Sequence, residues 1–194
     1  MPRRKRRSDE TVLDEAAAVM ARLGPDFTLA DVSRVSGIAP ATLVQRFGDK
    51  RGLVVMAAVR SNARFAAALD GAPRATGMDA VVDLFWTITP GEDEETALAE
   101  QLHWLRDDLR DPDLNALARE RRERLRAAVV ERLPPLPIPA EAAARLLEAQ
   151  WRGALLQWGL EPTGALADYV ADNLAAWFAL AAPWGSGLDG AGAG

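Results

Sequence analysis

Two side chains that can read the bases of a nucleic acid are adjacent near the N-terminus. Gln45 and Arg46 follow three small residues, Ala39, Ala41 and Thr42. In the major groove a glutamine amide can pair with adenine and an arginine with guanine, and small residues let a helix approach the base edges. Arg46 can instead contact a phosphate, and Thr42 a thymine methyl group or a phosphate. The segment therefore predicts a helix that enters the major groove of DNA.

The charges of the chain favour the same partner. Residues 1–64 carry 12 Lys and Arg against 7 Asp and Glu, whereas residues 65–194 carry 11 against 21. This asymmetry indicates a basic head that faces nucleic acid and an acidic body. Five of the positive charges form an arm: Arg3, Arg4, Lys5, Arg6 and Arg7. We expect the arm either to lie in the minor groove or to contact phosphates, and the alternative is an unstructured tail that promotes solubility.

The composition argues against most hydrolytic and metal chemistries. Cys is absent and His103 is the single histidine, so the sequence excludes disulfides, thiolate sites and histidine clusters. We expect neither a metal nor a cofactor. A remote alternative is an enzyme with a helical binding cavity, which would need a catalytic acid, base or nucleophile there. No targeting or membrane segment is expected, because the apolar stretch 174–183 is too short to span a bilayer, and the chain is predicted to be cytoplasmic.

Two short helices must position the candidate base-reading residues. The first is predicted over residues 29–36, because Thr28 and Asp31 have the spacing of a capping box. Gly37 supplies the turn, since glycine readily adopts a positive φ. The second helix is predicted over residues 40–46, with a proline in its first turn, where a missing N–H costs nothing.

Apolar residues of both helices are spaced to meet in one core: Leu29, Val32, Ile38, Leu43 and Phe47. A small residue, Ser33, stands where the helices must cross closely. This is the pattern of a helix-turn-helix. The alternative interpretation is an ordinary helical hairpin, whose outer face would be solvated.

The same segment resembles the TetR family of transcriptional regulators. The resemblance is carried by Phe27-Thr28-Leu29, Gly37-Ile38, Thr42-Leu43 and Phe47-x-x-Lys50-x-x-Leu53, and it covers about residues 9–55. Two residues depart from the family's pattern. Val44 stands where the family usually has tyrosine, and Ser33 where it usually has alanine. The first departure removes a phosphate hydrogen bond that a phenol would donate.

The resemblance implies roles for individual residues in DNA binding. Lys50, together with the amide groups at the start of its helix, would hold a phosphate. The helix that Thr28 caps could approach another phosphate. The groove-facing set would be Ala39, Pro40, Ala41, Thr42, Gln45 and Arg46, and Val44 belongs to the same candidate interface.

Helix-forming residues dominate the whole chain, and β-branched runs are missing. The sequence predicts an all-α fold of about nine helices, near residues 9–23, 29–36, 40–46, 49–69, 78–89, 93–109, 112–133, 140–160 and 163–182. The expected domains are a basic disordered arm over 1–8, a helix-turn-helix domain over 9–55, a ligand-binding and dimerisation domain over 56–183 and a flexible tail over 184–194.

The last two predicted helices carry apolar stripes at spacings of three and four residues. The resemblance implies that these helices pair with their copies in a homodimer, through Leu147, Trp151, Ala154, Leu155, Trp158, Leu166, Tyr169, Val170, Leu174 and Trp177. The alternative is that both stripes pack only in the core of their own chain. A two-fold dimer would bind a palindromic operator.

The resemblance also implies a cavity for a small molecule among the middle helices. The candidates to line it are Phe85, Trp86, Leu102, His103, Trp104 and Trp151, and such walls suit a hydrophobic or aromatic effector. Alternatively, these tryptophans are ordinary core or interface residues. We therefore expect a dimeric repressor that its ligand releases from DNA. The alternatives are a constitutive regulator or an architectural DNA-binding protein without a small-molecule ligand.

Overall fold

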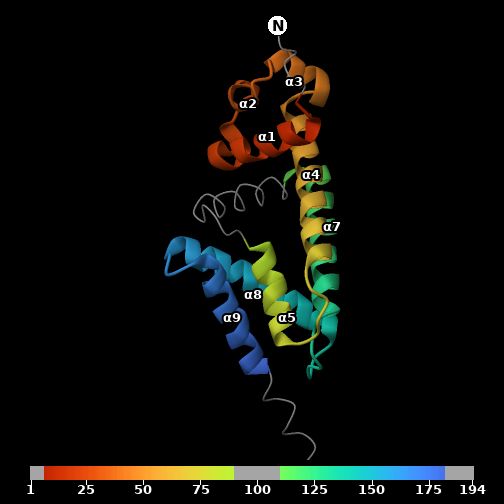
Figure 1. The fold of residues 1–194 in the computed structure, drawn as a ribbon, viewed down its shortest axis with the longest axis vertical. Helices are drawn as coiled ribbons and strands as arrows, with labels where there is room; N and C mark the ends of the chain where they lie inside the picture. The colour runs from red at the N-terminus through yellow and green to blue at the C-terminus, as the bar shows by residue number, and fades with distance from the viewer. Residues whose placement is uncertain (1–6, 90–109, 182–194) are drawn as a thin grey trace, which may run out of the picture. The chain divides into compact units, whose positions relative to one another are not determined.

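The computed structural model describes residues 7–89 and 110–181. Within these ranges the chain forms eight α-helices and one short 3-10 helix, without any β-strand, so the all-α prediction is confirmed (Figure 1). The elements are α1 (Asp9–Leu23), η1 (Gly24–Asp26), α2 (Leu29–Ser36), α3 (Pro40–Phe47), α4 (Lys50–Gly71), α5 (Met78–Ile88), α7 (Pro112–Val130), α8 (Ala140–Leu160) and α9 (Leu166–Ala181). The helix predicted over residues 93–109 lies outside the described residues.

Two helix boundaries lie three residues from the predicted ones, for local reasons, and the other boundaries of the described helices lie within two residues of the prediction. α7 ends at Val130 instead of residue 133, in a tight turn just before Pro134. Residues that precede a proline are disfavoured in helical conformation. α9 begins at Leu166 instead of residue 163, because Gly164 has a φ of 65° and breaks the helical path.

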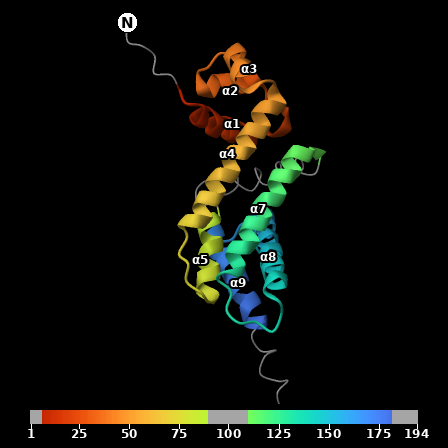
Figure 2. The same cartoon turned by 90° about the vertical axis from the view of Figure 1, so that its right-hand side faces the viewer.

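The chain divides into two compact units, and each is described by itself. The first unit contains residues 1–65 and 96–120, and the second contains residues 66–95 and 121–194. The first holds α1, α2, α3 and most of α4, with the start of α7. The second holds α5, α8 and α9, which gather together in Figure 2, with the ends of α4 and α7.

The core of the first unit takes one face from each of four helices. Its buried side chains include Val12, Val19, Val32, Leu43, Phe47, Leu53 and Ala57, and Leu29 and Ile38 pack against them. Leu43 has no exposed surface, and full burial of such a side chain contributes about 1.5–3 kcal/mol. The core positions predicted for the two short helices are therefore confirmed.

Local hydrogen bonds fix both ends of α2. The Thr28 hydroxyl accepts from the Asp31 N–H at 3.3 Å, and the Asp31 carboxylate accepts from the Thr28 N–H at 2.8 Å. This is the predicted capping box. At the other end Gly37 has a φ of 67°, and its N–H donates to the Ser33 carbonyl at 2.9 Å. α2 therefore stops at a defined residue, and the chain turns into α3.

The start of α4 approaches the end of α3 very closely. The Asp49 carboxylate accepts from the Gly52 N–H at 2.8 Å and caps α4. A Cβ atom built on Gly52 would lie 2.3 Å from the Phe47 carbonyl oxygen. A contact this short between a Cβ and a backbone atom forces the backbone to shift. The junction of α3 and α4 therefore requires glycine at this position.

By length and composition alone, α4 is the one helix among the described residues that could cross a membrane. Its side chains in the first unit indicate a different role. Leu53 and Ala57 are buried in the core with α1. Arg60, also on α4, pairs with Asp14 of α1, with its Nε 3.3 Å from the carboxylate. These contacts are those of a helix packed in a globular unit.

The second unit has a buried aromatic contact with a satisfied polar group beside it. The ring centroids of Phe85 on α5 and Trp151 on α8 are 5.6 Å apart. The Trp151 indole N–H donates to the Thr89 hydroxyl at 3.0 Å, and that hydroxyl donates to the Phe85 carbonyl at 2.7 Å. Because the Trp151 N–H and the Thr89 hydroxyl each have a hydrogen-bond partner, this contact can lie in the apolar interior without an unsatisfied polar group.

Arg132 is buried just beyond α7 and ties down the connection between α4 and α5. Its side chain is 2% exposed. The guanidinium donates to the carbonyl oxygens of Pro73 at 2.9 Å, Ala72 at 3.2 Å and Ala128 at 2.8 Å. The Arg132 carbonyl in turn accepts from the Gly77 N–H at 2.9 Å. One side chain therefore supplies hydrogen bonds to three carbonyl oxygens that have no regular helical partner.

Glu148 is a second buried charge of this unit, and it joins α7 to α8. The Glu148 side chain is 4% exposed, and its two oxygens accept from Arg126 at 2.6 Å and from Arg152 at 3.0 Å. A buried carboxylate needs such partners, because an unpaired one would carry a large desolvation cost.

We expect Gly52→Ala to destabilise the first unit by about 2 kcal/mol, since the new Cβ must displace the Phe47 carbonyl. Chemical denaturation followed by far-UV circular dichroism measures the change. Gly71→Ala is the matched control, because Gly71 is also in α4 and has open space around its Cβ position. Equal stability of the two variants would contradict the close approach.

Arg132→Met is expected to destabilise the protein by about 3 kcal/mol, because three carbonyls lose a charged donor within the interior. Arg74→Met is the control, since Arg74 is exposed on the same connection and should change stability by less than about 0.5 kcal/mol. Thermal unfolding of both variants distinguishes the two arginines. A wild-type midpoint for Arg132→Met would show that Arg132 does not stabilise the connection.

Candidate nucleic-acid interface

α3 presents most of the predicted groove-facing residues to solvent. Ala39, Pro40, Ala41, Thr42, Val44 and Gln45 are all exposed. Leu43 and Phe47 lie on the opposite side of the same helix and are buried in the first unit. Because α3 has only eight residues, these two anchors set the rotation of the helix about its axis. The outer face of α3 is consequently made of small, apolar and amide side chains.

Arg46 does not extend from this face. Its Nε donates to the Asp9 carboxylate at 2.7 Å, and its Nη2 contacts the same oxygen and the Arg7 carbonyl, the latter at 3.2 Å. Only 18% of the Arg46 side chain is exposed. The guanidinium expected to pair with guanine or phosphate therefore joins the end of α3 to the start of α1. Asp9 was not predicted as part of the site, and its separation of 37 residues explains why.

The N-terminal arm reaches the first unit next to this pair. Arg7 is the one residue of the arm within the described part of the chain, and its side chain pairs with Glu15 of α1. Its carbonyl accepts the hydrogen bond from Arg46. Arg3, Arg4, Lys5 and Arg6 lie outside the described residues. The last residue of the arm is thus held beside the C-terminal end of α3.

Lys50 is half-buried and already has partners in the first unit. Its Nζ donates to the Pro25 carbonyl at 2.6 Å and lies 4.4 Å from the centroid of the Phe27 ring. A lysine ammonium has three N–H donors, so this hydrogen bond leaves capacity for a phosphate oxygen. The contact also fixes the position of the ammonium at the start of α4.

Thr28 is exposed, but its hydroxyl is committed to the cap of α2. The hydroxyl donates to the Asp31 carboxylate at 2.6 Å, which is the first cause that lowers the pKa of Asp31. The Thr28 N–H and Arg34, whose side chain is 72% exposed, lower that pKa further. A charged carboxylate therefore already occupies the N-terminus of α2, where it competes with a phosphate. Arg34, which was not predicted as part of the site, is the exposed cation of this helix.

Other arginines of the basic head pair with carboxylates. The hydrogen bond from Arg60 is the main cause that lowers the pKa of Asp14, and Arg64 contributes as well. Arg51 donates to Asp111 at 2.8 Å, which lowers the pKa of Asp111 and raises the pKa of the Arg51 guanidinium. These arginines are on α4. Their ion pairs link elements within the first unit, so their charges are already partly neutralised by carboxylates.

The residues predicted for a dimer interface lie mostly in the interior of the second unit. Eight are at most 5% exposed: Leu147, Trp151, Ala154, Leu155, Trp158, Leu166, Val170 and Leu174. Tyr169 and Trp177 are half-buried, and the Trp177 ring packs edge-on against Phe178 at 5.2 Å. The apolar stripe read from the sequence is therefore used in the core of its own chain.

A different face of α8 is open. We call it the outer seam, and it consists of Leu146, Ala149, Gly153, Leu156 and Leu160. These residues recur at alternating spacings of three and four, which is the pattern of helix pairing. Leu160 is 75% exposed, and a Cβ on Gly153 would have no atom within 4 Å. This seam was not predicted from the sequence as a separate face, because it shares α8 with a longer and more apolar stripe.

The predicted cavity residues are divided between core and surface. Phe85 and Trp151 are buried against each other, whereas Trp86 is 55% exposed. Leu102, His103 and Trp104 lie outside the described residues. The described part of the second unit therefore brings together two of the six candidates.

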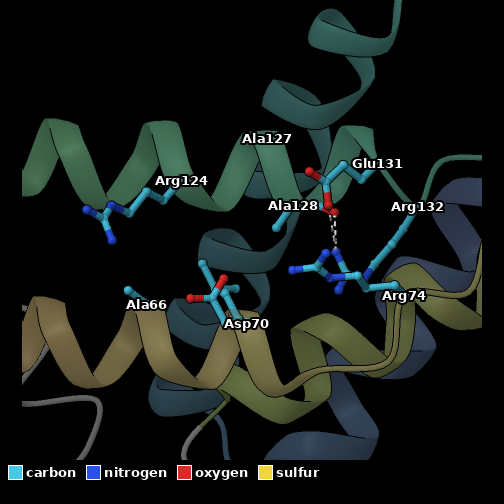
Figure 3. A pocket seen from close by; sticks show the side chains of 9 residues that line it. Ala66, Asp70, Arg74, Arg124, Ala127, Ala128, Glu131 and Arg132 are labelled. Carbon is cyan, nitrogen blue, oxygen red and sulfur yellow. Dashed lines mark hydrogen bonds and ion pairs between the residues drawn. The ribbon is translucent and has the colours of Figure 1, made fainter.

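A pocket of about 240 Å³ lies elsewhere in the second unit, between the end of α4 and the end of α7 (Figure 3). Leu69 and Asp70 form the α4 wall. Arg124 lies on the opposite wall, and Arg74 and Arg132 lie at one end. None of the residues predicted to line an effector cavity belongs to this pocket. Its walls combine charged side chains with Leu69 and several alanines, and Arg132 among them has the structural role described above.

Comparisons with known proteins give structural similarity alone. No protein-family model matches the sequence, and no curated protein matches it. A member of the TetR family from Streptomyces coelicolor A3 is 20% identical, with a TM-score of 0.68 over 87% of this chain and 98% of that one. A TetR transcriptional regulator from Legionella pneumophila is 15% identical, with a TM-score of 0.69 over 90% and 99%.

A third similar structure is a transcriptional regulator from Saccharomonospora viridis in complex with choline. It is 17% identical, with a TM-score of 0.69 over 87% of this chain and 93% of that one. At these identities the comparisons establish architecture, and they agree with the resemblance carried by residues 27–53. The chain therefore has the fold of the TetR-family transcriptional regulators.

Proposed function

We propose that this protein is a cytoplasmic transcriptional regulator that binds DNA through α3. The observation that carries the proposal is the two-sided character of that helix. Leu43 and Phe47 anchor it in the core, while Thr42, Val44 and Gln45 are exposed on its outer face. A helix held in this way can enter the major groove with its base-reading side chains in a fixed orientation.

Phosphate contacts supply the affinity in this proposal. Lys50 would use its remaining N–H groups, and Arg3–Arg7 would add contacts from the arm that begins beside α3. Thr28 would contribute only indirectly, by capping α2, because its N–H and hydroxyl both bond to Asp31. Contacts of this kind do not depend on base sequence, so binding should weaken strongly as salt rises.

The outer seam supports a homodimer as the DNA-binding species. Leu146, Leu156 and Leu160 are exposed leucines in a single line on α8, and the half-buried Gly153 leaves room for a close partner helix. Two copies of the chain could pair through this surface about a two-fold axis, because each outer seam would then face the outer seam of the other copy. The operator would then be a palindrome with one half-site for each α3.

A small effector that releases the protein from DNA completes the proposal. The similar regulator from Saccharomonospora viridis was solved with choline, which supports a ligand in this class of fold. The proposed effector here is hydrophobic or aromatic, near Phe85 and Trp151, with Leu102, His103 and Trp104 as further candidates. Because allosteric coupling of about 1–3 kcal/mol changes affinity five- to 150-fold, modest differential contacts are enough for repression and release.

Selection of bound sequences from random duplex DNA tests the DNA-binding proposal. We expect an enriched palindrome, and we expect Gln45→Ala to reduce discrimination at one position of each half-site by about tenfold. Gln157→Ala is the control, because Gln157 is exposed on α8 and should keep the wild-type preference. Enrichment of no sequence, with binding that depends only on salt, would contradict the proposal.

Sedimentation velocity tests the dimer. The double variant Leu146→Glu with Leu156→Glu places charges in the outer seam. It should weaken self-association about 100-fold or more, because each copy loses two leucines that the proposed dimer would bury. Its circular dichroism spectrum should stay unchanged, since both residues are exposed in the single chain. Met78→Glu, at an exposed apolar residue of α5, is the control. A dimer that survives the double variant would exclude the seam as the interface.

A further inference from the structure

The outer face of α3 carries an exposed β-branched apolar side chain. Val44 is 48% exposed, although it follows the fully buried Leu43. Ala41 lies three residues before Val44 and four before Gln45, so these three side chains share one face of the helix. Thr42 borders the same face. The surface at this point offers methyl groups from three residues and one amide.

This set of groups matches one kind of base pair. The thymine C5-methyl is the apolar group on the major-groove edge of the bases, and alanine, threonine and other apolar side chains contact it. Adenine presents N6 and N7, which a glutamine amide can engage with two hydrogen bonds. Val44 fits the first partner and Gln45 fits the second. Neither side chain has the two parallel donors that guanine selects.

The side chain of α3 that could read guanine is turned away from the outer face. Arg46 is its one cationic residue, and guanine is most often read by arginine or lysine. The Arg46 guanidinium is directed to Asp9, with Nε 2.7 Å from the carboxylate, and to the Arg7 carbonyl. The pair therefore leaves the outer face without a cation, and the apolar and amide groups determine what that face can bind.

We propose that α3 reads A·T base pairs, with Val44 against a thymine methyl group and Gln45 against the adenine of a neighbouring pair. Arg46 is a positioning residue that ties α3 and the N-terminal arm to Asp9. This inference rests on the DNA-binding function proposed above. It names the kind of base pair that α3 reads in each half-site. It also assigns a role in specificity to Val44, where the resemblance implied a lost phosphate contact.

Replacement of thymine by uracil in the selected operator tests the contact, since it removes the C5-methyl and keeps every hydrogen-bonding group. We expect one thymine in each half-site whose replacement weakens wild-type binding about fourfold, the usual effect of one buried methyl group. Val44→Ala should bind the thymine operator more weakly and show no further loss with uracil. Val59→Ala is the matched control, because Val59 is an equally exposed valine on α4 and should keep the fourfold effect.

The role of Arg46 has a separate readout in the same selection. Asp9→Ala releases the guanidinium, and we expect this variant to gain a preference for guanine at a position where the wild type has none. Arg46→Ala should weaken binding to every sequence alike, because the tie of α3 and the arm to Asp9 is lost, and should create no guanine preference. A wild-type guanine preference that Arg46→Ala abolishes would overturn the inference, as would uracil replacement without any effect. In both cases specific binding would persist and the proposed function would stand, whereas absence of any sequence preference would overturn both.

Discussion

The orientation of α3 depends on the burial of Leu43 and Phe47. A helix of eight residues is too short to be stable by itself, so its position comes from packing. These two side chains enter a core shared with α1, α2 and α4, and the rest of the candidate interface follows from their burial. If the helix rotated, Val44 and Gln45 would no longer share the outer face. Gly52 belongs to the same constraint, because it lets α4 begin directly against the last residue of α3.

The electrostatics of the first unit serve its fold as much as its proposed partner. Arg46, Arg51 and Arg60 each have a carboxylate within their own unit, so a count of cations overstates the positive surface available to DNA. The pKa values of Asp14 and Asp111 are lowered by these pairs, so both carboxylates stay charged to a lower pH than an unpaired aspartate does. Such pairs stabilise the unit above the unfolded pKa of the carboxylates, and this contribution is lost as the pH falls through the lowered values.

In the second unit, α8 carries two apolar faces, one buried and one exposed. Leu147, Trp151 and Trp158 face inward and are buried, while Leu146 and Leu156 face outward. A helix with two such stripes needs two partners, and the core of one chain supplies only the first. Glu148 of this helix pairs with Arg126 of α7, and Arg132 ties the end of α7 to the α4–α5 connection. The unit therefore has a fixed interior and a separate exposed seam, which is the surface that we propose for a second copy.

Much of this protein was determined by local sequence. The capping box of Thr28 with Asp31, the turn at Gly37 and the proline at residue 40 act over a few residues, so the positions of α2 and α3 and the outer-face residues of α3 could be read directly. The helix-turn-helix pattern also placed Leu43 and Phe47 in the core correctly, because their spacing fits one face of a short helix.

Tertiary structure alone decided which partners the long side chains take. Arg46 has the same local surroundings whether it extends toward DNA or turns to Asp9, and the choice depends on how α1 packs against α3. The same holds for α8, where Leu146 and Leu147 are neighbours in sequence and only one is buried. Capping and turn formation are settled within a few residues of backbone, whereas burial and ion pairing depend on segments that folding brings together from distant parts of the chain.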